Sequence, residues 1–179
     1  MKERKYKQDW VTETRVNDRT GKEKQVPVYR GPFFEDPFEG RKRERILAGL
    51  LPWVGYLLLL ILYFRLDFPG SRVLYVFLPA ALSLFPCLYW AMGLWSLLRA
   101  PERMTRLQKE TGFGRVLRSA AGCAILMLAA VIGEAVYLLS GAEVSREGPG
   151  ALMLLAGAGL AVGTAAVFRR AFRQLEKGT

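Results

Sequence analysis

Residues 46–64 have the sequence ILAGLLPWVGYLLLLILYF, 19 consecutive positions without a charged side chain. A helix of about 20 apolar residues is long enough to cross the hydrocarbon core of a bilayer. Three further stretches of this character follow, at residues 73–98, 120–139 and 151–168. The sequence therefore predicts an all-α membrane protein with four transmembrane helices, and we expect residues 46–168 to form its transmembrane domain.

The basic residues are distributed very unevenly around these predicted spans. Of the 26 Lys and Arg residues, 13 lie in residues 1–45, six in residues 99–118 and four in residues 169–179. The other two loops hold the remaining three, namely Arg65, Arg72 and Arg146. Because loops rich in Lys and Arg stay in the cytoplasm, we expect both termini and the middle loop on that side of a cell membrane. The net charge of +10 then reflects topology and not nucleic-acid binding.

The segment before the first predicted span, residues 1–45, is highly charged and contains two β-prone stretches. WVTETRV at residues 10–16 and QVPVYR at residues 25–30 flank the turn-like sequence NDRTGK. This pattern predicts a β-hairpin over about residues 10–30, whereas the alternative is a flexible tail. Pro27 restricts the second strand to a sheet edge. A protein partner could bind such a hairpin by adding a strand to its open edge.

An aromatic and basic segment connects the predicted hairpin to the first span. Phe33 and Phe34 lie among helix-breaking residues, and a basic cluster follows them, made of Arg41, Lys42, Arg43 and Arg45. Aromatic side chains beside a juxtamembrane basic cluster are typical of a segment that rests on anionic lipid headgroups. The alternative is a basic cluster that sets topology and does nothing more.

The middle loop contains the sequence PERMTRLQKE at residues 101–110. Pro101 near a first helical position and charge pairs at i,i+4 spacing predict a short helix at the membrane surface. We expect Gly112 and Gly114 to end this helix.

Small residues and prolines mark the helix faces expected to pack. Gly122 and Gly133 lie in a small-residue stripe on the third span, and Gly159 and Gly163 lie in one on the fourth. Because small residues let helices approach closely in lipid, we expect the two stripes to face each other within one chain, with a homodimer through the fourth span as the alternative. In the second span, the residue pair Pro79 and Pro86 predicts a bend.

Glu134 is the only acidic residue inside a predicted span, so it is the default candidate for a functional site. One hypothesis is structural, with an ion pair or hydrogen bond to a residue at the outer ends of the helices. The candidate partners are Arg65, Arg72, Arg146, Tyr63, Tyr75 and Tyr137. The other hypothesis is a transport site that binds a proton or a cation.

The remaining composition excludes several classes of function. The chain has no histidine, and its two cysteines, Cys87 and Cys123, lie in predicted spans without metal-binding spacing. We therefore expect no enzyme, no cofactor and no metal site. The architecture resembles that of small bacterial plasma-membrane proteins. It resembles small multidrug transporters in helix number, but the conserved glutamate of that family lies in its first span. We expect a non-catalytic accessory or scaffold protein with a basic cytoplasmic face for a partner or anionic lipid, or else a small transporter or channel.

Overall fold

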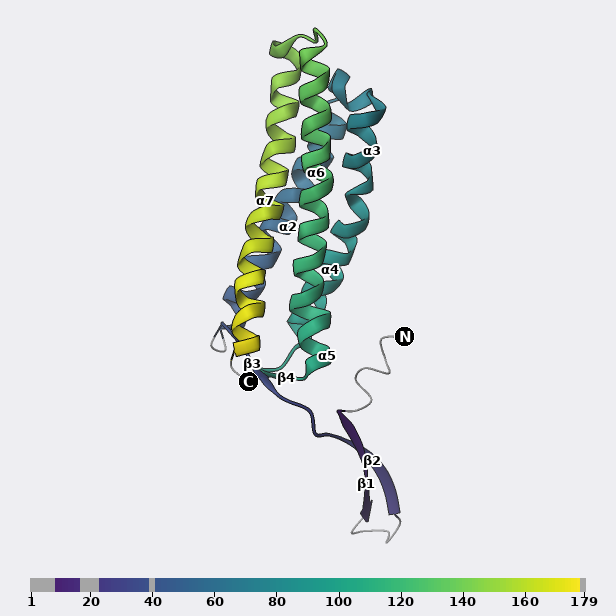
Figure 1. Ribbon diagram of the computed structural model, residues 1–179, viewed down its shortest axis with the longest axis vertical. Helices are drawn as coiled ribbons and strands as arrows, with labels where there is room; N and C mark the ends of the chain where they lie inside the picture. The colour runs from purple at the N-terminus through teal and green to yellow at the C-terminus, as the bar shows by residue number, and fades with distance from the viewer. Residues whose placement is uncertain (1–8, 17–22, 39–40, 178–179) are drawn as a thin grey trace.

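The computed structural model describes residues 9–16, 23–38 and 41–177. Its long helices form an elongated bundle, and a two-stranded sheet extends from one end of it (Figure 1). Four helical segments are long and apolar enough to cross a membrane, as the sequence predicted. These segments are Lys42–Arg65, Leu74–Arg99, Arg106–Leu139 and Val144–Leu175.

The chain order alternates long helices with short connecting elements. The helices are α2 (Lys42–Arg65), η1 (Pro69–Arg72), α3 (Leu74–Leu82), α4 (Leu84–Arg99), α5 (Arg106–Lys109), η2 (Glu110–Gly114), α6 (Arg115–Leu139) and α7 (Val144–Lys177). The strands are β1 (Trp10–Val16), β2 (Glu23–Tyr29), β3 (Phe34–Glu35) and β4 (Arg103–Met104). Helix α6 packs against α7, α3 and α4, while α2 packs against α7 and α4. We call the end of the bundle with β1 and β2 the hairpin end, and the end with η1 the loop end.

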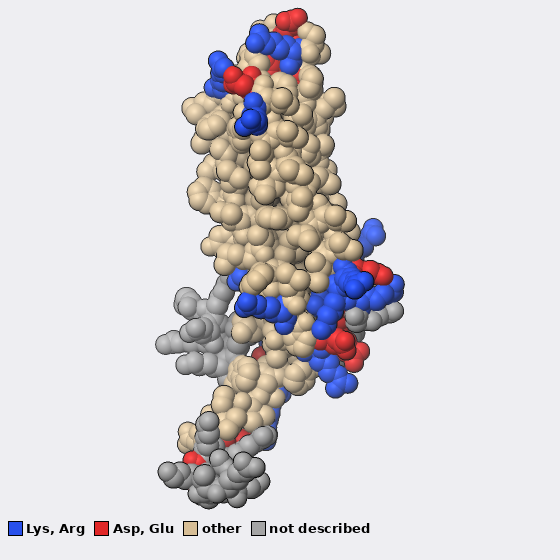
Figure 2. Space-filling view, turned by 180° about the vertical axis from the view of Figure 1, so that it is seen from behind, with Lys and Arg blue, Asp and Glu red and all other residues tan. Residues whose placement is uncertain are grey.

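The surface of the bundle is divided into an apolar belt and two charged ends. Charged side chains gather at the hairpin end and at the loop end, and the surface between them is almost free of charge (Figure 2). Large apolar side chains are exposed along this belt, including Leu58, Ile125 and Ile132. An exposed apolar surface of this extent is unfavourable in water but favourable in lipid. The belt fits a multi-pass membrane protein.

The second spanning helix is interrupted at Ser83, between α3 and α4. Pro79 and Pro86 each lack the N–H that a continuous helix would use. The Ser83 hydroxyl donates a hydrogen bond of 2.6 Å to the Ala80 carbonyl. Trp53 of α2 donates from Nε1 to the Cys87 carbonyl over 3.1 Å. Side chains thus add hydrogen bonds to backbone oxygens around the predicted bend, which a low-dielectric environment favours.

The middle loop differs from the prediction. Residues Arg103 and Met104 form β4, which pairs antiparallel with β3, so the helix predicted over residues 101–110 is present only in the second half of that segment. The helix begins after Thr105, where the Thr105 and Gln108 side chains form a capping box. It then continues into α6 through the π-helical turn η2. Gly112 and Gly114 therefore lie inside the helical segment and do not end it. At Gly112 the missing side chain makes room for Leu97, whose Cδ2 would lie 2.6 Å from a Cβ at position 112.

The predicted contact between the two glycine stripes is also wrong. Gly133 of α6 faces α3, where an added Cβ would lie 2.8 Å from the Tyr75 carbonyl oxygen. Gly122 faces Pro86 of α4, at 3.3 Å from its Cβ. Gly159 and Gly163 of α7 have no atom within 4 Å of the added Cβ among the described residues. Helices α6 and α7 do pack together, but through the opposite face of α7, which buries Leu154, Ala158 and Ala161.

We expect Gly133→Ala to destabilise the folded protein and Gly159→Ala to leave its stability unchanged or slightly higher. At position 133 the new methyl group meets a backbone oxygen that cannot rotate away, and overpacking of this kind costs about 1–3 kcal/mol. At position 159 the methyl group meets no described atom, and alanine favours a helix over glycine by about 0.5–1 kcal/mol. Thermal unfolding in detergent measures both. Equal losses would place Gly159 in a packed interface.

Candidate functional site

The two-stranded sheet at the hairpin end matches the predicted hairpin, although its turn, residues 17–22, lies outside the described residues. Strands β1 and β2 pair antiparallel from Trp10 opposite Tyr29 to Val16 opposite Glu23. Just beyond the strands, the Arg30 N–H donates to the Asp9 carbonyl over 2.8 Å. Trp10 packs edge-on against Tyr29, with ring centroids 5.3 Å apart. The sheet therefore carries an aromatic contact on one face.

The alternation of antiparallel pairs shows which backbone groups of β1 face outward. Because Asp9 and Arg30 are a hydrogen-bonded pair, the pairs two and four residues further along are hydrogen-bonded as well. The intervening residues Thr12 and Thr14 direct their N–H and C=O groups away from β2. Pro27, opposite Thr12, occupies the same kind of position on β2, where its missing N–H interrupts the outer edge. The outer edge of β1 keeps its donors.

A buried ion pair attaches the hairpin to the bundle. Arg45, in the first turns of α2, is fully buried and donates from Nη1 to Oδ2 of Asp36 over 2.7 Å. Its Nη2 donates to the Leu97 carbonyl at the end of α4 over 2.8 Å. A guanidinium is well suited to this place because it can donate to a carboxylate and to a carbonyl at a helix end together. One side chain thus joins the segment after β3, helix α2 and helix α4.

This geometry corrects part of the predicted lipid-contacting segment. Arg45 does not reach headgroups, because Asp36 and the end of α4 enclose it. Phe34 is buried as well, since β3 pairs with β4 and the Lys109 ammonium lies 4.3 Å from the centre of the Phe34 ring. The other members of the predicted segment are exposed, namely Phe33, Arg41, Lys42 and Arg43.

The second polar cluster lies at the loop end, around Glu134. Glu134 of α6 and Glu147 of α7 are both buried, and their carboxyl groups interact directly. Tyr63 of α2 donates to Oε2 of Glu134 over 3.4 Å. Two carboxylates in contact repel each other, so the pair is compatible with burial when it holds a proton between its oxygens. Oε1 of Glu134 receives no hydrogen bond from an N–H or hydroxyl group of the described chain, which leaves it free to accept that proton.

The short helix η1 supports this carboxyl pair. The backbone N–H of Gly70 donates to Oε2 of Glu147 over 3.1 Å. A Cβ at position 70 would lie 2.6 Å from Oε1 of Glu134 and 2.8 Å from its Cδ. Glycine is therefore needed where the loop approaches the two carboxyl groups. The cluster connects α2, α6, α7 and the loop before α3.

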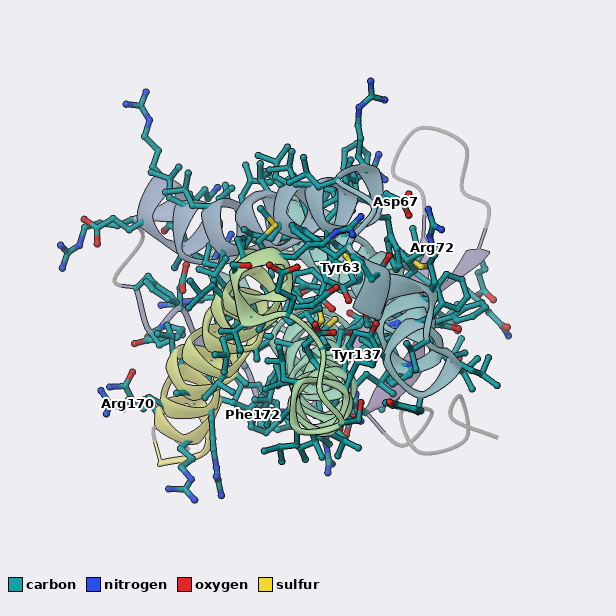
Figure 3. All side chains as sticks on the ribbon, turned by 90° about the horizontal axis from the view of Figure 1, so that it is seen from above. Tyr63, Asp67, Arg72, Tyr137, Arg170 and Phe172 are labelled. Carbon is teal, nitrogen blue, oxygen red and sulfur yellow. The ribbon has the colours of Figure 1, made fainter. Side chains whose placement is uncertain are left out.

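Of the six partners that the sequence suggested for Glu134, only Tyr63 forms a hydrogen bond with it among the described residues. Tyr63 contacts it, but Arg72 instead binds Asp67, donating from Nε to Oδ1 over 3.0 Å. This hydrogen bond lowers the pKa of the Asp67 carboxyl below its usual range. Figure 3 shows Asp67 and Arg72 together at the periphery, with Tyr63 further inside. No described contact joins Arg65, Arg146, Tyr75 or Tyr137 to Glu134.

Sequence reasoning missed Glu147 because the fourth span was expected to begin at residue 151. Helix α7 begins at Val144, and Glu147 lies in its first turn. An acidic residue in the first turn of a helix was the available signal, since it favours the positive end of the helix dipole. Among the described residues no group of three or more metal-ligating side chains occurs.

We expect Arg45→Ala to lower the free energy of unfolding by about 3–5 kcal/mol, because it leaves the buried Asp36 carboxylate without its partner. Arg43→Ala is the matched control, since Arg43 is exposed two positions earlier in the same helix. Its loss should stay within about 0.5 kcal/mol. Thermal or denaturant unfolding in detergent measures the difference. If both variants were equally stable, the Arg45 contacts would not hold the hairpin end together.

Comparisons of this chain with protein-family models, curated proteins and solved structures found no match. Its function therefore has to be argued from its two polar clusters and its exposed surfaces.

Proposed function

We propose that this protein is a non-catalytic membrane scaffold that presents the β1–β2 hairpin to a protein partner on the cytoplasmic side. The observation that carries the proposal is the outer edge of β1, which pairs with no described strand and keeps its outward N–H groups. An extended segment of a partner can add to such an edge as a third strand. A two-stranded sheet alone is marginally stable in water, and a third strand would stabilise it.

The surroundings of the hairpin support a role in recognition. Trp10 is 43% exposed and Phe33 is 53% exposed, and both pack against Tyr29 at the base of the sheet. The Tyr29 hydroxyl accepts a hydrogen bond of 3.2 Å from the backbone N–H of Arg106 at the start of α5. The hairpin is thus attached to the bundle through Tyr29 as well as through the Asp36–Arg45 pair. Exposed aromatic side chains beside an open strand edge are typical of protein interfaces.

The distribution of charge supports the proposed cytoplasmic placement. Most of the basic side chains lie at the hairpin end, and positively charged loops are retained in the cytoplasm. The start of α2 and the end of α7 lie at this same end (Figure 1), which agrees with an even number of spans. A partner of the hairpin would then be a cytoplasmic protein or a cytoplasmic segment of a membrane protein.

We expect Thr14→Pro to abolish partner binding and Thr14→Val to preserve it. Proline removes one outward N–H from the edge of β1 without removing a bond between β1 and β2, whereas valine keeps that N–H. The measurement is co-purification of the tagged full-length protein from native membranes, with partners identified by mass spectrometry. One discrete partner should be retained by the unmodified protein and by Thr14→Val, and lost with Thr14→Pro. Equal recovery with both variants would exclude strand addition along β1.

A proton-coupled transporter is the second candidate, and the buried pair of Glu134 and Glu147 is the observation that favours it. A pair that shares one proton can gain and lose it as a transport cycle proceeds. In this case Glu134→Gln should stay folded but lose proton flux, because an amide keeps hydrogen bonding without binding the proton. The measurement uses proteoliposomes with an imposed pH gradient and an enclosed pH-sensitive dye. Indistinguishable flux in the unmodified protein, Glu134→Gln and empty liposomes would exclude transport.

A further inference from the structure

A groove runs along the apolar belt between α6 and α7. It has a volume of about 730 Å³ and extends from Leu117 to Leu128 on α6 and from Val162 to Arg173 on α7. Alanines line its central part, including Ala121 on α6 and Ala165 on α7. Because these small side chains do not fill the space between the two helices, a hollow remains, and larger apolar residues surround it. The wall is apolar except at the hairpin end.

The length of the groove matches one leaflet of a bilayer. Leu117 and Leu128 are 11 residues apart, which corresponds to about 16 Å along a helix. Half of a hydrocarbon core is about 15 Å thick. The groove therefore begins near the middle of the apolar belt and ends at the boundary with the charged hairpin end. A single acyl chain of the leaflet at that end could lie along it.

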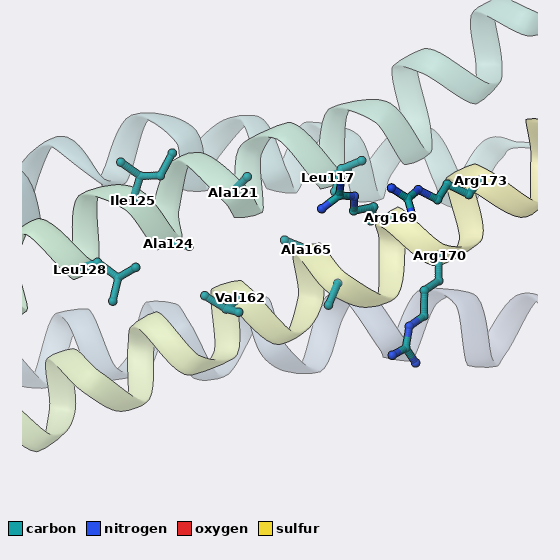
Figure 4. Close-up of a pocket in the computed structure, with 11 residues that line it drawn as sticks. Leu117, Ala121, Ala124, Ile125, Leu128, Val162, Ala165, Arg169, Arg170 and Arg173 are labelled. Carbon is teal, nitrogen blue, oxygen red and sulfur yellow. The ribbon is translucent and has the colours of Figure 1, made fainter.

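Two arginines close the groove at this boundary. Arg169 and Arg173 are four residues apart on α7, so they lie on one helical face. Both side chains extend toward α6 across the end of the groove, whereas Arg170, which also lines the groove, extends away from α6 (Figure 4). Arg169 and Arg173 are exposed and form no ion pair with a described carboxylate. Guanidinium groups arranged in this way can bind the oxygens of a phosphate with several charge-assisted hydrogen bonds.

We propose that the α6–α7 groove binds one anionic phospholipid of the leaflet at the hairpin end, with an acyl chain against the alanines and the phosphate on Arg169 and Arg173. The inference stands apart from the proposed function, because neither the hairpin nor the carboxyl pair lines the groove. It assigns a defined lipid site to residues outside the basic cluster at positions 41–45. Only Arg43, Lys42 and Arg41 of that cluster remain exposed for general contact with headgroups.

Charge favours a lipid over a second copy of this chain as the occupant. Two copies in the same membrane orientation that met through this face would bring their Arg169 and Arg173 side chains together. Like charges at close range oppose association, and no described acidic residue lines the groove to compensate. An anionic phospholipid instead supplies the complementary charge at the depth where the arginines lie.

The test is native mass spectrometry of the delipidated full-length protein titrated with phosphatidylglycerol or with phosphatidylcholine of the same acyl chains. The unmodified protein should bind one phosphatidylglycerol at least about tenfold more tightly than phosphatidylcholine. Phosphatidylglycerol has a net negative charge, whereas the choline cation of phosphatidylcholine neutralises its phosphate and is repelled by the two arginines. Combining Arg169→Gln with Arg173→Gln should reduce this preference to about threefold or less. Arg99→Gln is the matched control and should preserve it, because Arg99 is exposed at the hairpin end of α4 and does not line the groove.

A second pair of variants tests the apolar part of the site. Ala121→Leu fills the groove and should weaken the binding of both lipids, whereas Ala156→Leu, on an exposed part of α7 outside the groove, should not. Thermal unfolding confirms that each variant is folded. An unchanged lipid preference in the double arginine variant, or an equal loss with Arg99→Gln, would overturn the proposal. So would a protein dimer that disappears with Ala121→Leu, because a second chain would then occupy the groove.

Discussion

The hairpin end of the molecule depends on one buried guanidinium. Arg45 is fully enclosed, so the charge it carries has to be matched inside the protein. Asp36 supplies the opposite charge, and the carbonyl of Leu97 accepts a further hydrogen bond. Because these groups come from three separate parts of the chain, the pairing fixes the segment after β3 against α2 and α4. The β3–β4 pairing and the contact of Tyr29 with the start of α5 lie beside this attachment. The position of the hairpin therefore depends on the need to neutralise the buried Arg45 charge.

Both buried polar clusters lie near the ends of the bundle, and this arrangement reflects the cost of polar groups in lipid. The middle of the bundle is filled by aromatic and aliphatic side chains such as Tyr56, Trp90 and Met127. At the hairpin end the buried charges include a paired arginine and aspartate, whereas at the loop end two buried glutamate side chains lie against Gly70. Breaking a buried ion pair is strongly unfavourable, so the first cluster is suited to holding a structure. Two ionised carboxyl groups close together repel each other, so the second cluster is less suited to that purpose.

The sequence was sufficient to predict the number of spans, their approximate positions and the two strands of the hairpin, because apolar length and alternation are local properties. It was insufficient for every feature that depends on how the helices are rotated. The stripe with Gly159 looks equivalent to the stripe with Gly133, yet α7 turns Ala158 and Ala161 inward instead. Arg45 resembles its exposed neighbours in sequence, and its burial depends on Asp36 and on the end of α4. Glu147 was missed because helix α7 begins before its apolar stretch does.

The rotation of α7 also accounts for the surfaces that remain available for binding. With Leu154, Ala158 and Ala161 facing the bundle, Ala165 and Ala166 lie beside the alanines of α6 and leave a groove instead of a filled contact. The same rotation directs Arg169 and Arg173 across the end of that groove, at the hairpin end of the bundle. A lipid phosphate held there would lie at the membrane surface on the same side as the open edge of β1. Recognition of a partner and of a lipid would then take place on one face of the membrane, which agrees with the concentration of basic residues and of exposed backbone donors at that end.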